Sequence, residues 1–243
     1  MNVLGYLRSR LAEGKVHLSL LDPDKLTPGE AGEVAFRAHL AGTDGIMVGG
    51  STGVTPETTD ATVKAIKART RVPVILFPAG AHALSRFADA VYFMSMLNST
   101  DVRMIVGEQR KAARAIQAWG LETIPMGYLI VEPGMRVGEI GRARPIARGD
   151  VEEAVRYALT AQYLGMQLVY LEAGSGAPDP VPPAMVSAVK KELSIPLVVG
   201  GGIRTPEAAR ATAHAGADIV VTGTVIEEDQ ARLQAIVDAV KGR

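Results

Sequence analysis

The sequence contains no cysteine, which excludes disulfide scaffolds, thiolate nucleophiles and cysteine-ligated zinc. It also lacks a net charge, because 26 lysine and arginine side chains balance 26 acidic ones, so we expect no nucleic-acid partner. No apolar run approaches the roughly 18 residues that a membrane-spanning helix needs. The start of the chain shows no secretory signal pattern. These absences predict a cytoplasmic globular protein without an integral membrane segment.

Eight short apolar runs alternate with longer helical stretches along the 243 residues, a pattern typical of parallel βαβ units. Most of the runs are apolar throughout, as in strands that are covered on both faces. The number of units and the chain length predict an α/β fold, a single (β/α)8 TIM barrel over residues 1–243. The expected strands are residues 16–21, 45–48, 74–77, 90–93, 123–131, 168–171, 196–199 and 218–222.

Three expected helix starts share a threonine followed by proline, at Thr27, Thr55 and Thr205. The segment between residues 77 and 89 has little room, so we expect the third helix of the barrel to be short or missing. An open doubly wound sheet is the competing fold, but it usually requires a glycine fingerprint near the first strand. Residues 22–25, Asp-Pro-Asp-Lys, stand there instead, which favours the barrel.

In a (β/α)8 barrel, the segments that follow the strands meet at one mouth, where active sites are built. Glycine-rich turns follow the seventh and eighth expected strands, at residues 200–204 and 223–224. Glycines let backbone N–H groups approach an anion closely, and this is the recurrent phosphate site of such barrels. We therefore predict a phosphate site here; the alternative is that these glycines only permit tight turns.

Three carboxylates at the expected mouth are candidates for chemistry. Glu172, after the sixth strand, could accept a proton from a substrate hydroxyl or could bond loop amides, and nearby Ser175 could extend the phosphate site. Asp22 and Asp24 flank a proline after the first strand, where a carboxylate beside a bound diphosphate could hold Mg²⁺. Taken alone, these two aspartates favour simple loop capping.

The longest expected connection, residues 132–150, is rich in arginine. Its arginines either clamp a diphosphate or belong to a solvated loop. They are Arg136, Arg142, Arg144 and Arg148. His82 lies near the expected mouth, but the four histidines of the chain do not have the spacing of a metal site. The apolar segment at residues 92–97 either lines a lipid-binding groove or belongs to the core.

Three of the mouth segments carry longer motifs: Asp-Pro-Asp-Lys, Gly-Gly-Ser-Thr-Gly and Tyr-Leu-Glu-Ala-Gly-Ser-Gly. Many phosphate-binding barrels share glycine turns, whereas this combination is much more specific. In order and spacing, over essentially the whole chain, the motifs resemble those of the geranylgeranylglyceryl phosphate synthase family. The matching segments are residues 21–25, 42–44, 48–53, 93–99, 170–176 and 199–204.

The resemblance implies a prenyltransferase that forms the first ether bond of archaeal-type membrane lipids. Such an enzyme would transfer a geranylgeranyl group from geranylgeranyl diphosphate to the sn-3 hydroxyl of sn-glycerol 1-phosphate. It would release diphosphate and would use Mg²⁺ as its cofactor. The resemblance also implies a homo-oligomer.

Carried over by motif, the resemblance also implies roles for individual residues. Glu172 would be catalytic, contacting the glycerol hydroxyls and taking the proton from the attacking one. Asp22 and Ser51 would be metal-site residues. Glycerol phosphate would be held by Tyr170, Leu171, Glu172, Ala173, Gly174, Ser175, Gly176, Gly201, Gly202, Gly223 and Thr224.

Leu20 departs from the bacterial branch of the family, which carries lysine two residues before the first aspartate. The departure favours the geranylgeranyl form over the longer-chain bacterial one. We expect Phe93, Met96 and Leu97 to lie near the prenyl tail. The alternatives are a synthase for a longer or shorter prenyl chain, a sugar-phosphate isomerase or synthase barrel, and a phosphate-sensing regulatory barrel without turnover.

Overall fold

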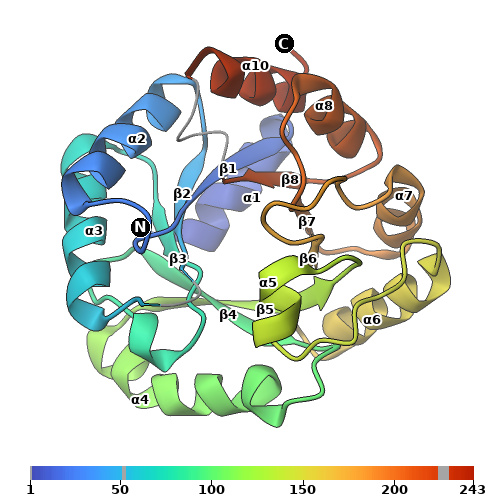
Figure 1. The fold of residues 1–243 in the computed structure, drawn as a ribbon, viewed down its shortest axis with the longest axis horizontal. Helices are drawn as coiled ribbons and strands as arrows, with labels where there is room; N and C mark the ends of the chain where they lie inside the picture. Colours follow the sequence, from blue (N-terminus) through green and yellow to red (C-terminus); the bar gives the residue numbers. More distant parts are fainter. Residues whose placement is uncertain (1, 51–52, 224–229) are drawn as a thin grey trace.

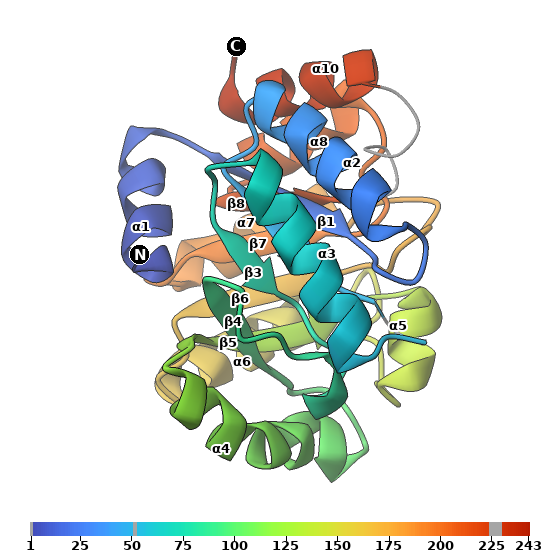
Figure 2. The same ribbon diagram turned by 90° about the vertical axis from the view of Figure 1, so that its left-hand side faces the viewer.

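A computed structural model of the protein describes residues 2–50, 53–223 and 230–243. Within these ranges, eight parallel strands pair in chain order, and β1 pairs with β8 to close a barrel. Helices form a ring around the strands (Figure 1). In the second view, α2 and α3 lie side by side against the barrel (Figure 2). The (β/α)8 fold expected from the sequence is confirmed.

The strands lie within two or three residues of their expected positions. Their bounds are β1 Val16–Leu21, β2 Gly45–Val48, β3 Val74–Leu76, β4 Ala90–Met96, β5 Glu122–Ile130, β6 Leu168–Glu172, β7 Leu197–Gly200 and β8 Ile219–Thr222. The largest difference is at β4, which continues to Met96 because it stays in register with β5 as far as Tyr128. The sequence prediction ended this strand at residue 93.

The helices fill the connections between the strands, and one precedes β1. Their bounds are α1 Val3–Glu13, α2 Pro28–Leu40, α3 Pro56–Arg69, α4 Glu108–Trp119, α5 Met135–Ile140, α6 Val151–Tyr163, α7 Pro183–Glu192, α8 Pro206–His214 and α10 Gln230–Lys241. Two shorter turns are η1, a 3₁₀ turn at Ala81–Ala83, and η2, a π-helical turn at Arg103–Gly107. As expected, the third connection holds only a short helical turn, η1.

The three threonine–proline signatures begin helices as predicted. The Thr27 side chain accepts a hydrogen bond from the Glu30 amide, and the Glu30 side chain caps the Thr27 backbone in return. Thr55 and Thr205 cap α3 and α8 through the amides of Thr58 and Ala208. Each cap satisfies a backbone donor that the first helical turn leaves without a partner.

Alternate residues of each strand pack on opposite sides of the barrel wall. One set fills the interior with large side chains such as Leu18, Met47, Ile75, Tyr92 and Ile124. The other set packs under the helices in two further clusters. Burial on both sides explains why the strands are apolar throughout, and each fully buried aliphatic side chain contributes about 1.5–3 kcal/mol.

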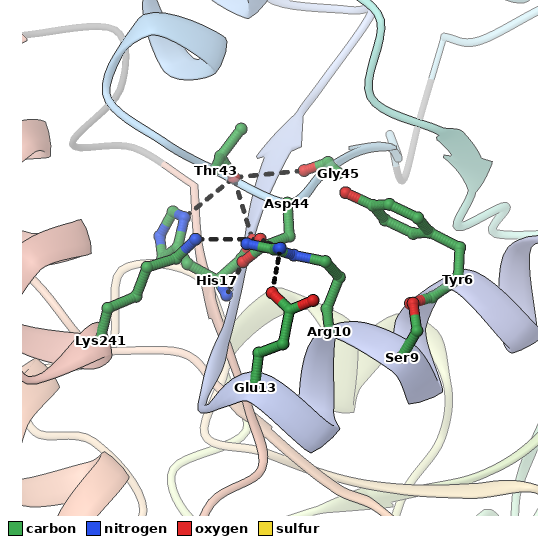
Figure 3. A network of polar contacts seen from close by, with 9 residues as sticks. All are labelled: Tyr6, Ser9, Arg10, Glu13, His17, Thr43, Asp44, Gly45 and Lys241. Atoms are coloured by element: carbon green, nitrogen blue, oxygen red, sulfur yellow. Dashed lines mark hydrogen bonds and ion pairs between the residues drawn. The ribbon is translucent and has the colours of Figure 1, made fainter.

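A buried ion-pair network joins the two ends of the chain. Asp44, just before β2, contacts Arg10 of α1 at 3.1 Å and Lys241 of α10 at 2.9 Å. Its second carboxylate oxygen accepts a hydrogen bond from the His17 amide at the start of β1 (Figure 3). The network therefore ties the first and last helices to the start of β1 and to the turn before β2. Among the described residues, no helix has the length and apolar character needed to cross a bilayer.

Candidate active site

A cavity of about 420 Å³ opens at the carboxyl ends of the strands. Its wall combines three kinds of surface: glycine-rich turns after β6, β7 and β8, acidic residues after β1, and a broad apolar side formed by β3, β4 and α4. A volume of this size suits a small-molecule site. The mouth is where the sequence pattern places the chemistry of a (β/α)8 barrel.

Glu172, the last residue of β6, presents a buried carboxylate to this cavity. Burial raises its pKa, because the charged form loses solvation. Hydrogen bonds from the Gly174 amide, at 2.7 Å, and from the Tyr170 and Tyr128 hydroxyls oppose that shift in pKa. A carboxylate with a raised pKa binds a proton more readily than an exposed one, so Glu172 is suited to act as a general base.

Gly200, the last residue of β7, and Gly201, which follows it, let the chain pass close to Glu172. A Cβ at Gly200 would overlap the Tyr170 hydroxyl, and one at Gly201 would overlap the Glu172 carboxylate and lie 2.6 Å from the Gly174 amide nitrogen. Gly201 also has a φ of +82°, a conformation that L side chains rarely adopt. Side chains are therefore excluded where the β6 and β7 turns meet.

The glycine turns come together from three strands. Ser175 and Gly176 after β6, Gly201 and Gly202 after β7, and Gly223 after β8 all line the cavity. The Arg204 guanidinium donates to the Ala177 carbonyl oxygen at 3.0 Å, which holds the β6 and β7 turns together. Backbone amides clustered in glycine turns form an anion-binding surface.

An aromatic cluster stands between the glycine turns and the apolar side of the cavity. Phe77 stacks on Tyr170 with ring centroids 5.6 Å apart, and it meets Tyr128 edge-on at 5.4 Å. Tyr92 approaches Phe77 at 6.3 Å. Beyond the cluster, the wall is formed by apolar side chains, among them Phe93, Met94, Met96, Met104, Ala112 and Ile116.

The acidic side of the cavity is formed by the turn after β1. Asp22 and Asp24 both line it, and Asp22 accepts a hydrogen bond from Lys25 at 2.6 Å. Gly50, after β2, lies next to this turn, with Asp24 Oδ1 3.7 Å from the position of a Cβ there. Among the described residues, no three acidic or histidine side chains gather into one group that could hold a metal ion.

The structure brings most of the site residues predicted from sequence to this one cavity. Asp22, Tyr170, Glu172, Ser175, Gly176, Gly201, Gly202 and Gly223 line it. Gly174 contributes its amide to Glu172. Leu171 and Ala173 are instead fully buried in the cluster between the barrel and the helices. Ser51 and Thr224 lie outside the described residues.

The four loop arginines and His82, whose roles the sequence left open, differ in whether they line the cavity. Arg136 lines the cavity, whereas Arg142 and Arg144 are exposed and are not part of its lining. Arg148 donates to the Pro180 carbonyl oxygen at 2.8 Å. His82 is exposed on η1. Of the four arginines, Arg136 is the one that lines the cavity, and a role of this arginine in binding diphosphate stays a prediction.

The three residues expected near the prenyl tail do not all line the cavity. Phe93 and Met96 line the apolar side of the cavity, as predicted. Leu97 instead packs against the cluster between the barrel and the helices. Tyr92, the first residue of the apolar segment at residues 92–97, also lines the cavity. Phe77 and Tyr128 were not predicted as site residues, although a tyrosine within an otherwise apolar strand is a signal that could have identified Tyr128.

The fold and the cavity define a class of protein: a (β/α)8 barrel whose mouth joins glycine turns, a buried carboxylate and an apolar wall in a single site. Comparison with known proteins narrows this class. The profile of the PcrB family matches residues 9–241. The chain therefore belongs to the PcrB family.

Two similar proteins and one solved structure carry the name of the same enzyme. The geranylgeranylglyceryl phosphate synthase of Thermococcus gammatolerans is 52% identical over 92% of this chain and 88% of its own length. That of Thermoplasma acidophilum is 49% identical over 99% of this chain and 96% of its own length. The crystal structure of the Thermoplasma acidophilum enzyme, in complex with its substrate sn-glycerol-1-phosphate, superposes with a TM-score of 0.97 at 48% identity, covering 100% of both chains.

Proposed function

We propose that this protein is a prenyltransferase that joins geranylgeranyl diphosphate to sn-glycerol 1-phosphate, forming the first ether bond of archaeal-type membrane lipids. The observation that carries the proposal is the position of Glu172. Its buried carboxylate lies where the glycine turns meet the aromatic cluster and the apolar wall. Relatives of about 50% identity over most of the chain, all named for this synthesis, support the same conclusion.

The glycine turns would hold the acceptor. The amides around Gly176, Gly201, Gly202 and Gly223 suit a phosphate group, and Ser175 adds a hydroxyl. With its phosphate held there, the glycerol part of the acceptor would extend toward Glu172. Holding the acceptor in this way replaces a chance encounter with a positioned attack.

The reaction then has a simple balance of bonds. The sn-3 oxygen forms a bond to the first prenyl carbon as the bond from that carbon to the diphosphate oxygen breaks. The hydroxyl proton passes to the Glu172 carboxylate, and the electron pair of the broken bond leaves with diphosphate. Tyr128 and Tyr170, which hydrogen-bond to Glu172, would orient the carboxylate for this transfer.

The apolar wall would hold the prenyl tail. Phe93, Met96 and Met104 supply apolar contact, and α4 extends the same surface with Ala112 and Ile116. A tail of four isoprene units is too long for the mouth of the barrel alone. An apolar wall that extends from the mouth to α4 would accommodate it.

We also propose a magnesium ion as cofactor, at the acidic side of the cavity. Mg²⁺ commonly binds through one or two carboxylates together with substrate phosphates, and Asp22 and Asp24 offer such oxygens in the cavity wall. When bound, Mg²⁺ would neutralise the negative charge of the diphosphate. Ser51, the second metal-site residue implied by resemblance, lies outside the described residues.

The direct experiment is an assay with radiolabelled sn-glycerol 1-phosphate and geranylgeranyl diphosphate, with Mg²⁺ and with EDTA. We expect an ether-linked product that requires the divalent cation. Absence of the ether product under both conditions would contradict the proposal. Equal product with EDTA would overturn only the magnesium part.

The same assay separates the alternatives. A sugar-phosphate isomerase or synthase would leave the prenyl diphosphate unused, and a regulatory barrel would bind phosphate without turnover. A series of prenyl diphosphates of different length would decide between geranylgeranyl and longer or shorter chains. The homo-oligomer and the cytoplasmic location stay predictions, for which sedimentation and cell fractionation are the tests.

A further inference from the structure

His17 of β1 is a buried histidine that takes no direct part in the proposed reaction. Its ring has no solvent exposure. Its neighbours in sequence, Val16 and Leu18, belong to the interior cluster, so the His17 ring lies on the outer side of the barrel wall. There it sits near Thr43 and Lys241 of α10 (Figure 3).

Both ring nitrogens of His17 contact a threonine hydroxyl. Nδ1 lies 2.9 Å from Oγ1 of Thr43, in the turn before β2. Nε2 lies 2.9 Å from Oγ1 of Thr222, the last residue of β8. The ring therefore bridges the turn before β2 and the carboxyl end of β8 across the seam of the barrel.

The other contacts of Thr43 indicate where the ring proton lies. The Thr43 hydroxyl has one hydrogen, which it donates to the carbonyl oxygen of His17 at 3.0 Å or that of Gly45 at 3.3 Å. It accepts from the Ser19 hydroxyl at 3.2 Å. The arrangement that keeps these bonds makes His17 Nδ1 the donor to Thr43. Nε2 is then the acceptor, and the Thr222 hydroxyl donates to it.

Thr222 occupies the point where the chain leaves the sheet. Its pairing with Ser19 is the last between β8 and β1, and the next residue is Gly223, part of the proposed phosphate-binding surface. Gly223 runs close to β1, with the Leu20 carbonyl oxygen 3.7 Å from the position of a Cβ. A fixed Thr222 side chain thus limits the directions in which the Gly223 amide can point.

We propose that His17 is a positioning residue for the acceptor phosphate, acting through its hydrogen bond to Thr222. A neutral ring with an unprotonated Nε2 holds the Thr222 hydroxyl, and Thr222 holds the start of the β8 turn at Gly223. The inference rests on the proposed function, because it assigns the β8 turn to sn-glycerol 1-phosphate.

The test replaces Thr222 with valine, which has the same shape but no hydroxyl. We expect the Thr222→Val variant to raise KM for sn-glycerol 1-phosphate about tenfold, the effect of losing roughly one hydrogen bond. The KM for geranylgeranyl diphosphate should stay within about twofold, since that substrate binds elsewhere in the cavity. Calorimetric binding of sn-glycerol 1-phosphate alone should weaken by the same factor as its KM.

Two further variants separate positioning from general loss of stability. Thr222→Ser keeps the hydroxyl and should restore the KM for sn-glycerol 1-phosphate. Arg10→Gln removes the ion pair of Arg10 with Asp44 and leaves the contacts of the His17 ring in place, so it should lower Tm and leave both KM values unchanged. In the double variant His17→Gln, Thr222→Val, the two effects on the KM for sn-glycerol 1-phosphate should not add. Both changes remove the same hydrogen bond, the one between His17 Nε2 and Thr222 Oγ1.

Nitrogen NMR of the His17 ring gives a readout independent of turnover. We expect the Nδ1-protonated tautomer in the wild type. An Nε2-protonated ring, or a Thr222→Val protein that binds sn-glycerol 1-phosphate as well as the wild type does, would overturn the inference and leave the proposed function intact. A wild-type protein that binds no sn-glycerol 1-phosphate would instead overturn the proposed function, and this inference with it.

Discussion

At the scale of single residues, Glu172 is a carboxylate in two opposing environments. Burial raises its pKa, while an amide and two tyrosine hydroxyls stabilise its charge. The result is a group that stays available as a base and still holds a proton once it has taken one. Tyr128, on the adjacent strand β5, would therefore affect the proposed proton transfer, although it belongs to no motif in the sequence.

The first prediction replaces this base. Glu172→Gln keeps the shape of the side chain but cannot take the proton, so kcat should fall by about a hundredfold or more. Binding of sn-glycerol 1-phosphate, measured by calorimetry, should remain. In the wild type, kcat/KM should fall as the pH drops through the raised pKa of Glu172, at a higher pH than for an exposed carboxyl. A near-normal rate in the variant would show that Glu172 has only a structural role.

The second prediction concerns Asp22. If this carboxylate holds the metal, Asp22→Asn should lower turnover at a fixed low Mg²⁺ concentration, and a higher Mg²⁺ concentration should partly restore it. Binding of sn-glycerol 1-phosphate should be largely retained, because the proposed phosphate site consists of glycine-turn amides and Ser175 and does not include Asp22. Steady-state rates over a Mg²⁺ titration measure the effect. An unchanged Mg²⁺ dependence would exclude Asp22 from the metal site.

At the scale of elements, the turn after β7 depends on having no side chain. A methyl group at position 201 would press on the Glu172 carboxylate and on the Gly174 amide, and the backbone there has a positive φ. The geometry of this turn and the position of the proposed base are therefore coupled.

The third prediction follows from this coupling. Gly201→Ala should reduce kcat/KM by about a hundredfold or more, since both the proposed base and a proposed phosphate-binding turn must move. Gly29→Ala is the matched control: Gly29 lies in the first turn of α2, and nothing stands within 4 Å of a Cβ there. The control should keep full activity. Equal rates for the two variants would mean that the β7 turn tolerates a side chain.

At the scale of the whole molecule, the buried Asp44 carboxylate connects the first and last helices of the chain. Asp44 binds both terminal helices, and His17 beside it has its pKa lowered to about 4 by burial, with the Lys241 ammonium lowering the pKa further and the Asp44 carboxylate raising it. A histidine that is neutral when folded and has an ordinary pKa when unfolded links stability to pH.

The fourth prediction gives the sign of this link. In the unfolded chain His17 binds a proton below about pH 6.5, whereas in the folded protein it stays neutral down to about pH 4. The contribution of His17 to the free energy of unfolding is therefore complete above pH 6.5. It is lost as the pH falls toward 4, by about 3 kcal/mol in total. Urea denaturation at a series of pH values measures it. The His17→Gln variant should show a shallower decline over this interval, and an identical decline would contradict the assignment.

Much of the fold could be predicted because its signals are local. Apolar runs and threonine caps are written in consecutive residues, and a strand buried on both faces needs little else to be recognised. The end of β4 was missed because it depends on pairing with β5, a distant segment. The glycine turns were likewise readable, since a residue without a side chain is needed wherever two backbones come close.

The sequence by itself determined the barrel, its mouth and the chemical character of the turns that surround it. Only the tertiary structure decided which side chains share the cavity: it brought Tyr128 to Glu172 and Phe77 against Tyr128, and it buried Leu171 under the helices. The physical reason is that the strand pleat and the barrel closure set the direction of each side chain. These depend on contacts between residues far apart in the chain, and no local pattern records them.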